Sequence, residues 1–259
     1  MIARVSRITI ALLLATATAG LAQSAQPVDH GGVLAVAELD DLRGRWEDVT
    51  SLPGLPELLR SSAAALGWSE GAIPDSFAPR EALVFFSVDG GPGVRLARVP
   101  SQEVARIAHA RIDALWDARL GEAPLVRGVI DLASVRRMLR DWAAEEPIPL
   151  RALAWEILAA RLEPFDAAVF SRDVVRGRIR GAAWLRYRAP GQDGAALAGF
   201  ALAPGEAAPL EGGIGLAQLP ALVRLLGALD GLSVDITLEE GGMLVVGQAP
   251  FDPGSTDRP

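Results

Sequence analysis

Residues 176–188 alternate between two kinds of side chain, and this pattern constrains the fold more than any other feature of the chain. Successive side chains of a β-strand point to opposite faces, so every second residue lies on the same surface. We therefore predict a strand whose two faces differ in chemistry. One face carries five arginines and a tryptophan: Arg176, Arg178, Arg180, Ala182, Trp184, Arg186 and Arg188. The other face is small or apolar: Gly177, Ile179, Gly181, Ala183, Leu185 and Tyr187.

The rest of the chain mixes short β-rich runs with amphipathic stretches, which favours an α+β fold. Glycine-rich turns at 89–93 and 240–242 indicate hairpins. We expect a mostly antiparallel sheet with helices packed on one face and solvent on the other. Strands are predicted at 33–39, 82–88, 94–99, 125–130, 165–171, 176–188, 197–203, 232–239 and 243–248. Helices are predicted over 42–49, 55–66, 101–120, 132–146, 150–162 and 216–229.

These predicted elements divide into two parts. Residues 33–131 run in the order strand, helix pair, strand, strand, helix, strand, which is the element order of a ferredoxin-like βαββαβ lobe. Residues 132–250 hold a helix pair followed by an antiparallel sheet. Residues 251–259 are polar and contain proline, and we predict a disordered tail there. The pattern leaves open whether the two parts are one domain or two.

The first 25 residues have the pattern of a secretory signal peptide. A short basic region precedes an apolar run at 8–21, and small residues then allow cleavage after Ala22 or Ala25, so we assign 1–22 as the signal peptide. The apolar run is shorter than the ~20 residues that a membrane-spanning helix needs, although an uncleaved anchor is the alternative. No later segment is apolar enough to span a membrane. We expect an exported bacterial protein, either periplasmic or secreted.

The charge balance argues against nucleic acid as a partner. The chain has 25 basic and 32 acidic residues and a formal net charge of -7, whereas nucleic-acid phosphates bind basic surfaces. There is no cysteine, which excludes disulfides, thiolate metal sites and lipid attachment at a cysteine. There is no lysine either, so every basic charge apart from histidine is an arginine. With two histidines and no cysteine, neither a metal nor another cofactor is predicted.

One stretch near the start carries a resemblance. A strand ending in Asp-Asp-Leu is followed by an amphipathic helix and by the sequence Leu-Pro-Gly-Leu-Pro-Glu-Leu-Leu. Residues 33–60 in this respect resemble the opening of some uncharacterised exported bacterial proteins of unknown function. The resemblance implies export and carries no known activity, so it transfers no catalytic residue to this chain.

Three constellations have a catalytic or ligand-binding interpretation beside a plainer one. Residues 67–71 (GWSEG) fit the elbow of serine hydrolases with Ser69 as nucleophile, but a predicted helix precedes them where the elbow needs a strand. His109 and Asp113 share a helix face and could orient an imidazole or supply two metal ligands, or they are a solvated pair. The glycine-rich stretch 212–215 precedes a helix but lacks the lysine and spacing of a phosphate-binding loop.

The cationic face of 176–188 also has two interpretations. Arginine binds carboxylates and phosphates in a planar fork and stacks on aromatic rings, so the face could bind an anionic ligand. In a chain without lysine, however, any solvated cationic face must be built from arginine. Asp235, Thr237 and Glu239 share one face of a second predicted strand, and they would pair with the arginines if the two strands were neighbours.

We therefore predict an exported, non-enzymatic binding or accessory protein of the cell envelope. Its partner would be an anionic envelope component or an acidic protein. The predicted binding residues are Arg176, Arg178, Arg180, Trp184, Arg186 and Arg188. The alternatives are a serine hydrolase that uses Ser69 and a carrier that holds an apolar ligand between the sheet and the helix predicted at 216–229.

Overall fold

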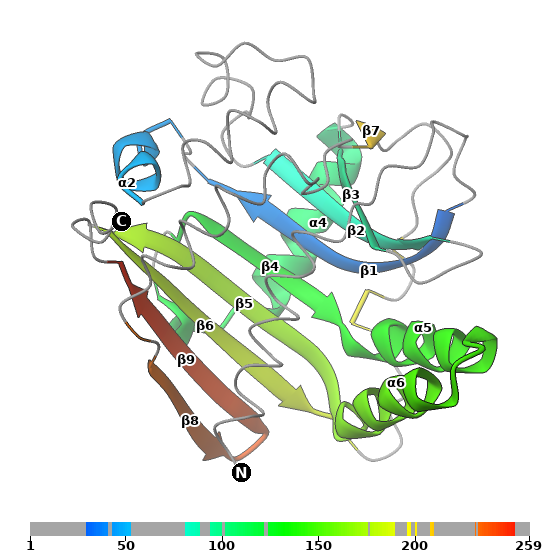
Figure 1. Cartoon of the computed structure of the whole chain (residues 1–259). Coiled ribbons are helices and arrows are strands. Elements are labelled where there is room, and N and C mark those ends of the chain that lie inside the picture. The colour runs from blue at the N-terminus through cyan, green and yellow to red at the C-terminus, as the bar shows by residue number, and fades with distance from the viewer. Residues whose placement is uncertain are drawn as a thin grey trace, which may run out of the picture.

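The computed structural model shows a continuous antiparallel sheet with helices packed against it (Figure 1). This arrangement confirms the predicted α+β class. The structure describes residues 30–40, 43–52, 81–88, 94–99, 102–121, 124–175, 177–189, 196–197, 200, 208–209, 231 and 233–251.

Nine strands of the described residues form this sheet, and every neighbouring pair is antiparallel. Their bounds are β1 (His30–Leu39), β2 (Glu81–Val88), β3 (Val94–Arg98), β4 (Val126–Asp131), β5 (Phe165–Val175), β6 (Arg178–Tyr187), β7 (Ala208–Pro209), β8 (Ser233–Glu239) and β9 (Gly242–Pro250). Their order across the sheet is β7-β3-β2-β1-β4-β5-β6-β9-β8. Because β4 pairs with β5, one sheet contains strands from both of the parts that the sequence distinguishes.

The strand order differs from the ferredoxin-like arrangement predicted for the N-terminal part. Val36 of β1 pairs with Val84 of β2 on one side and with Val129 of β4 on the other. In a split βαβ unit the strand after the first helix is separated from the first strand, whereas here the two are direct neighbours. The order β4-β1-β2-β3 is that of a Greek key. Element order along a chain does not determine which strands pair, and this prediction was wrong for that reason.

Four α-helices are described, and two of them lie on opposite faces of the sheet. These two are α4 (Gln102–Leu115), which lies behind β1, β2 and β4 in Figure 1, and α2 (Trp46–Thr50). Val36 packs in a cluster with the buried side of α4, while its neighbour Ala37 packs with Val49 of α2. We call these surfaces the α4 face and the α2 face. The sequence predicts helices on one face of the sheet only, and the short helix α2 is an exception to that prediction.

The main core lies on the α4 face. The aliphatic side chains that fill it come from adjacent strands and from one stripe of α4, as the helical spacing of that stripe predicts. The members that form its centre are Val36, Val84, Val129, Val169, Val104, Ala108 and Ile112. A smaller core on the α2 face includes Leu39, Leu52, Leu83 and Phe251. Phe251, assigned by the sequence to a disordered tail, is buried there, and residues 252–259 lie outside the described residues.

A helical hairpin joins β4 to β5. It consists of α5 (Leu132–Glu145) and α6 (Pro149–Arg161), which lie side by side beyond the ends of these strands (Figure 1). Asp131 caps α5 as predicted, because its Oδ1 accepts a hydrogen bond from the Ser134 amide at 3.0 Å. Its Oδ2 accepts a second bond from the Leu197 amide at 3.0 Å, which ties a distant segment to the start of the helix.

Two predicted elements end or fold differently. The helix predicted over 101–120 stops at Leu115, because Asp117 has an extended backbone and caps the separate 3-10 helix η2 (Ala118–Leu120). Leu197 lies in a turn and not in the predicted strand 197–203, of which only residues 197 and 200 are described. The helices predicted at 55–66 and 216–229 lie outside the described residues.

Among the described residues, no helix combines the length and the apolar character that crossing a bilayer requires.

Candidate functional site

The structure separates the members of the predicted cationic face. Arg178 and Arg180 are exposed near one end of β6, whereas Arg186 is half-buried near the other end. Arg186 forms a two-point ion pair with the buried Asp166, with both nitrogen–oxygen distances at 2.8 Å. A register shift between Phe165 and Ala167 accompanies this pairing, since two residues of β5 there face one of β6. Arg176 lies outside the described residues.

Trp184 belongs to the core and not to the surface. It lies on the same face as the arginines, as the alternation predicts, but only 8% of it is exposed. The guanidinium of Arg119, from η2, covers its ring at 4.0 Å from the ring centre. Arg119 also forms ion pairs with Asp117 and with Glu239 of β8. Trp184, predicted as a binding residue, is therefore a core residue that Arg119 covers.

The ion pair between Asp117 and Arg119 makes the free energy of unfolding depend on pH in the acidic range. Two hydrogen bonds from Arg119, at 2.8 and 2.6 Å, hold the pKa of Asp117 below its usual value. A carboxyl group with a lowered folded-state pKa stabilises the protein above the ordinary aspartate pKa of about 3.9, and this contribution disappears as the pH falls through the folded-state value.

We expect Asp117→Asn to make unfolding less dependent on pH below about pH 4, where the wild type loses this contribution. Urea unfolding midpoints measured from pH 7 to pH 2 would check this. Asp141→Asn, at an exposed position on α5, is the control and should follow the wild type. Identical pH profiles for the wild type and Asp117→Asn would contradict the assignment.

The acidic partners of the arginines are not those that the sequence suggests. β9 lies between β6 and β8, so Asp235 and Thr237 are not neighbours of the arginine strand. Arg186 pairs instead with Asp166 of β5, and Arg188 pairs with Glu163 in the turn before β5. Ion pairs with a neighbouring strand do neutralise part of the cationic face of β6. That neighbour is β5, and not β8 as the sequence suggested.

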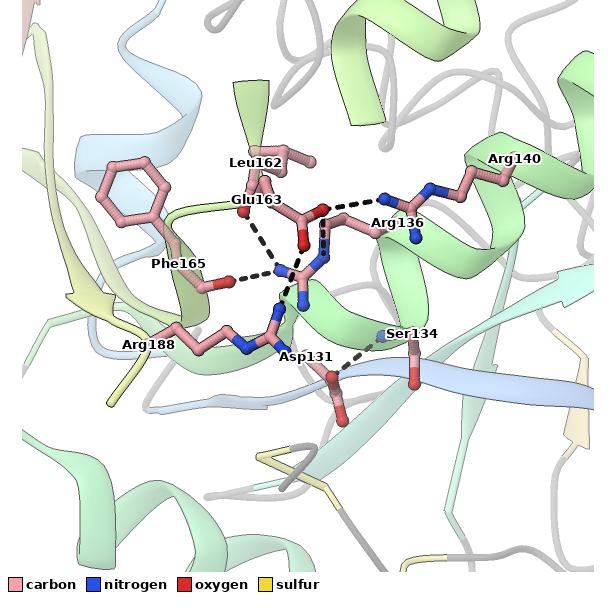
Figure 2. A network of polar contacts seen from close by, with 8 residues as sticks. All are labelled: Asp131, Ser134, Arg136, Arg140, Leu162, Glu163, Phe165 and Arg188. Atoms are coloured by element: carbon pink, nitrogen blue, oxygen red, sulfur yellow. Dashed lines mark hydrogen bonds and ion pairs between the residues drawn. The ribbon is translucent and has the colours of Figure 1, made fainter. Parts of the chain in front are cut away.

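Three arginines meet at Glu163, and we call Arg136, Arg140, Arg188 and Glu163 the arginine cluster (Figure 2). The Glu163 carboxylate accepts hydrogen bonds from Arg140 Nη2 at 2.8 Å and from Arg188 Nη1 at 3.0 Å. Arg136 Nε lies 3.9 Å from the same carboxylate. Figure 2 shows the three guanidinium groups pointing toward this one acid from α5 and from the end of β6. The cluster carries three positive charges and one negative charge.

Arg136 forms the buried base of the cluster. It donates hydrogen bonds to the backbone carbonyls of Leu162, at 3.1 Å, and Phe165, which lie in the turn between α6 and β5. Only 7% of Arg136 is exposed. Burial lowers its pKa, since the charged form loses water, and the Glu163 charge opposes that effect. Its role is to hold the turn that presents Glu163.

Arg140 and Arg188 form the accessible part of the cluster. Their side chains are 59% and 35% exposed, and Glu163 is 47% exposed. A guanidinium presents five donors in a planar fork, and three such groups surround one carboxylate here. The arrangement is suited to accepting a second anion, either a carboxylate or a phosphate. The sequence pattern identified Arg188, but it did not indicate the two arginines of α5, which converge on it only in the fold.

A second charged group lies between α4 and the sheet. Glu38, only 2% exposed, forms an ion pair with Arg127 of β4, and Arg127 also bonds Asp113 at 2.8 Å. His109 Nε2 lies 3.6 Å from the Glu38 carboxylate. His109 and Asp113 therefore both turn toward residues of the sheet. Burial acts to lower the pKa of Arg127, but the hydrogen bond and charge of Glu38, helped by Asp113, outweigh it and raise that pKa.

Other candidates from the sequence are not placed by the structure. Ser69 with its motif and the glycine-rich stretch 212–215 lie outside the described residues. Within the described part of the chain, no three side chains of histidine, aspartate or glutamate gather as metal ligands. The arginine cluster is thus the candidate site that the geometry supports best.

Comparisons of the chain with protein-family models, with curated proteins and with solved structures find no match.

Proposed function

We propose that this protein is an exported, non-enzymatic protein of the cell envelope that binds an anionic envelope component or an acidic protein partner through the arginine cluster. The observation that carries this proposal is the convergence of three guanidinium groups on one carboxylate. The leader-like pattern of residues 1–22 supports the export part of the proposal.

The charge of the cluster supports an anionic ligand. Arg136 is already occupied by two backbone carbonyls, so its hydrogen bonds serve the fold. Arg140 and Arg188 each donate one hydrogen bond to Glu163, and both side chains are partly exposed to solvent, so a second anion can reach both guanidinium groups. A carboxylate or phosphate bridging these two groups would bring the net charge of the cluster closer to zero.

The exposed Arg178 and Arg180, at the other end of β6, form a separate cationic patch. Arg178 and Arg188 lie ten residues apart, a separation of about 30 Å along a strand. A compact anion therefore binds at one end of the strand only, and we assign it to the end where three arginines meet. A long polyanion would reach both ends, so the variants of the two ends distinguish these cases.

The double variant Arg140→Gln/Arg188→Gln is expected to weaken anion binding at least tenfold, because it removes the accessible charges of the cluster. The probes are vesicles of phosphatidylglycerol in phosphatidylcholine, as an anionic lipid, and poly-L-glutamate, as an acidic chain. Wild-type binding to one of these probes should fall as salt is raised from 50 to 300 mM, since exposed charges are screened at about that range. Vesicle co-sedimentation and fluorescence anisotropy measure the two affinities.

Matched variants decide whether the effect is local. Arg137→Gln removes the same charge from an exposed position on the same helix and should change the affinity less than twofold. Glu163→Gln leaves the arginines uncompensated and should tighten binding. If neither probe binds the wild type, or if Arg137→Gln weakens binding as much as the double variant, the arginine cluster is not the binding site. An additional loss in Arg178→Ser/Arg180→Ser would indicate an extended polyanion.

A further inference from the structure

The outer surface of α6 is apolar and exposed. Leu150 is 77% exposed, and Leu153 and Ile157 are each 50% exposed. Ala154 and Ala160 on the same side are also exposed. Exposed large aliphatic side chains that cluster on one helix, and are not scattered singly, indicate a binding surface.

The opposite side of α6 is already packed. Ala159 is buried, and Trp155 contacts Trp142 of α5 edge to face, with the ring centres 5.4 Å apart. The helix is consequently apolar on two sides, and its described contacts with α5 lie on one of them. An apolar side of a helix is normally covered by other parts of the protein or by a partner.

The exposed residues follow the spacing of a coiled-coil seam. Leu150, Leu153, Ile157 and Ala160 are separated by three, four and three residues, which is the a–d spacing of the heptad repeat. Side chains at this spacing fit between those of another helix that has the same spacing. The seam is therefore suited to a second helix, and a second copy of α6 supplies a matching one.

We propose that this face of α6 is the contact between two copies of the chain, with the two α6 helices antiparallel. In that arrangement Leu153 of one copy faces Ile157 of the partner subunit, and Leu150 faces Ala160 of the partner subunit. The exposed Arg161, at the end of α6, then lies beside the acidic residues Glu145 and Glu146 that precede α6 in the partner. The two ends of the contact thus complement each other in charge, and each complementary pair occurs twice.

The charges beside the seam favour a second copy over a lipid surface. Arg151, Glu156 and Arg161 border the apolar stripe, so both signs are present. Helices that lie on anionic membranes carry predominantly basic residues on the polar side. The contact is short, because a helix of 13 residues is about 20 Å long. We therefore expect a weak dimer, with a dissociation constant roughly in the micromolar range, because its interface is smaller than that of a typical stable complex.

Sedimentation velocity of the purified full chain, over a concentration series from 1 to 200 µM, tests the proposal. The wild type should shift from monomer to dimer as concentration rises. Leu153→Glu should raise the dissociation constant at least tenfold, because it places a charge in the seam. Ala110→Glu, which adds the same charge at an exposed position of α4, should behave as the wild type. Melting temperatures would show that both variants fold.

Disulfide trapping tests the orientation, since the natural chain has no cysteine to interfere. An oxidised mixture of the Leu153→Cys and Ile157→Cys chains should yield more crosslinked dimer than either variant alone. More crosslinking in the separate variants would indicate a parallel pair and overturn the antiparallel arrangement.

A wild type that stays monomeric at 200 µM overturns the proposal. So does equal dimerisation of the Leu153→Glu and Ala110→Glu chains. Co-sedimentation of a monomeric wild type with phosphatidylglycerol vesicles that is lost in Leu153→Glu would also overturn it, because the same face would then bind lipid. None of these results bears on anion binding by the arginine cluster, which the arginine variants test separately.

Discussion

Replacing Glu38 with alanine is expected to destabilise the protein by about 3–5 kcal/mol, because it leaves a largely buried charge without its partner. Glu38 is 2% exposed and the Arg127 side chain is 17% exposed, so water cannot replace the lost carboxylate. Of the acidic partners that the described residues provide to Arg127, the exposed Asp113 would remain. Urea unfolding at pH 7, followed by circular dichroism, measures the change.

Two further variants identify the cause of this loss. Glu38→Gln keeps the size of the side chain and an acceptor oxygen, so it should cost less than Glu38→Ala. The double variant Glu38→Leu/Arg127→Met removes both charges and should recover much of the stability, since an apolar pair of similar volume often replaces a buried ion pair at little cost. A loss below about 1 kcal/mol for Glu38→Ala would mean that the pair is effectively solvated.

Replacing Arg136 with leucine is expected to destabilise the protein by about 2–4 kcal/mol, because it removes two hydrogen bonds from a buried guanidinium to backbone carbonyls. The affected carbonyls belong to Leu162 and Phe165, which connect α6 to β5. Leucine is apolar and cannot supply a hydrogen bond there. The same urea titration measures the effect, and near-ultraviolet circular dichroism would report the tryptophans of the helical hairpin.

Arg140→Leu is the matched control for Arg136. It lies one turn later on α5 and its side chain is 59% exposed, so we expect a loss below about 0.5 kcal/mol. Equal losses in the two variants would mean that the Glu163 ion pairs, and not the carbonyl bonds, hold the turn. A large loss confined to Arg136 would assign it to the fold and leave Arg140 for ligand binding.

The local elements of this protein follow from local sequence signals. The alternation from 178 to 187 predicts β6 and assigns its side chains to the correct faces, and Asp131 predicts the start of α5. Such signals act within a few residues, so they survive in any fold. Strand neighbours depend on contacts between distant segments, and for that reason the position of β2 beside β1 could not be inferred.

The candidate site was only partly predictable for the same reason. Arg188 belongs to the alternating stretch 176–188, and the sequence therefore predicted it as a binding residue. Arg136 follows the pattern of an ordinary charged helix residue, and nothing adjacent indicates that the α6–β5 turn will bury it. Conversely, Trp184 was placed on the correct face, but the cover that Arg119 provides comes from a segment far away in the sequence. The local sequence showed which side chains are charged or aromatic, but it did not show which of them the fold would bury.

The central position of β1 also affects when the protein can fold. β1 is the first of the described strands along the chain, yet its partners β2 and β4 begin only at Glu81 and Val126. Until both have been synthesised, the first strand has no native edge to join, and closing such long loops slows folding. If the chain is exported as we propose, this delay would keep it extended while it crosses the membrane, so the sheet would assemble only on the far side.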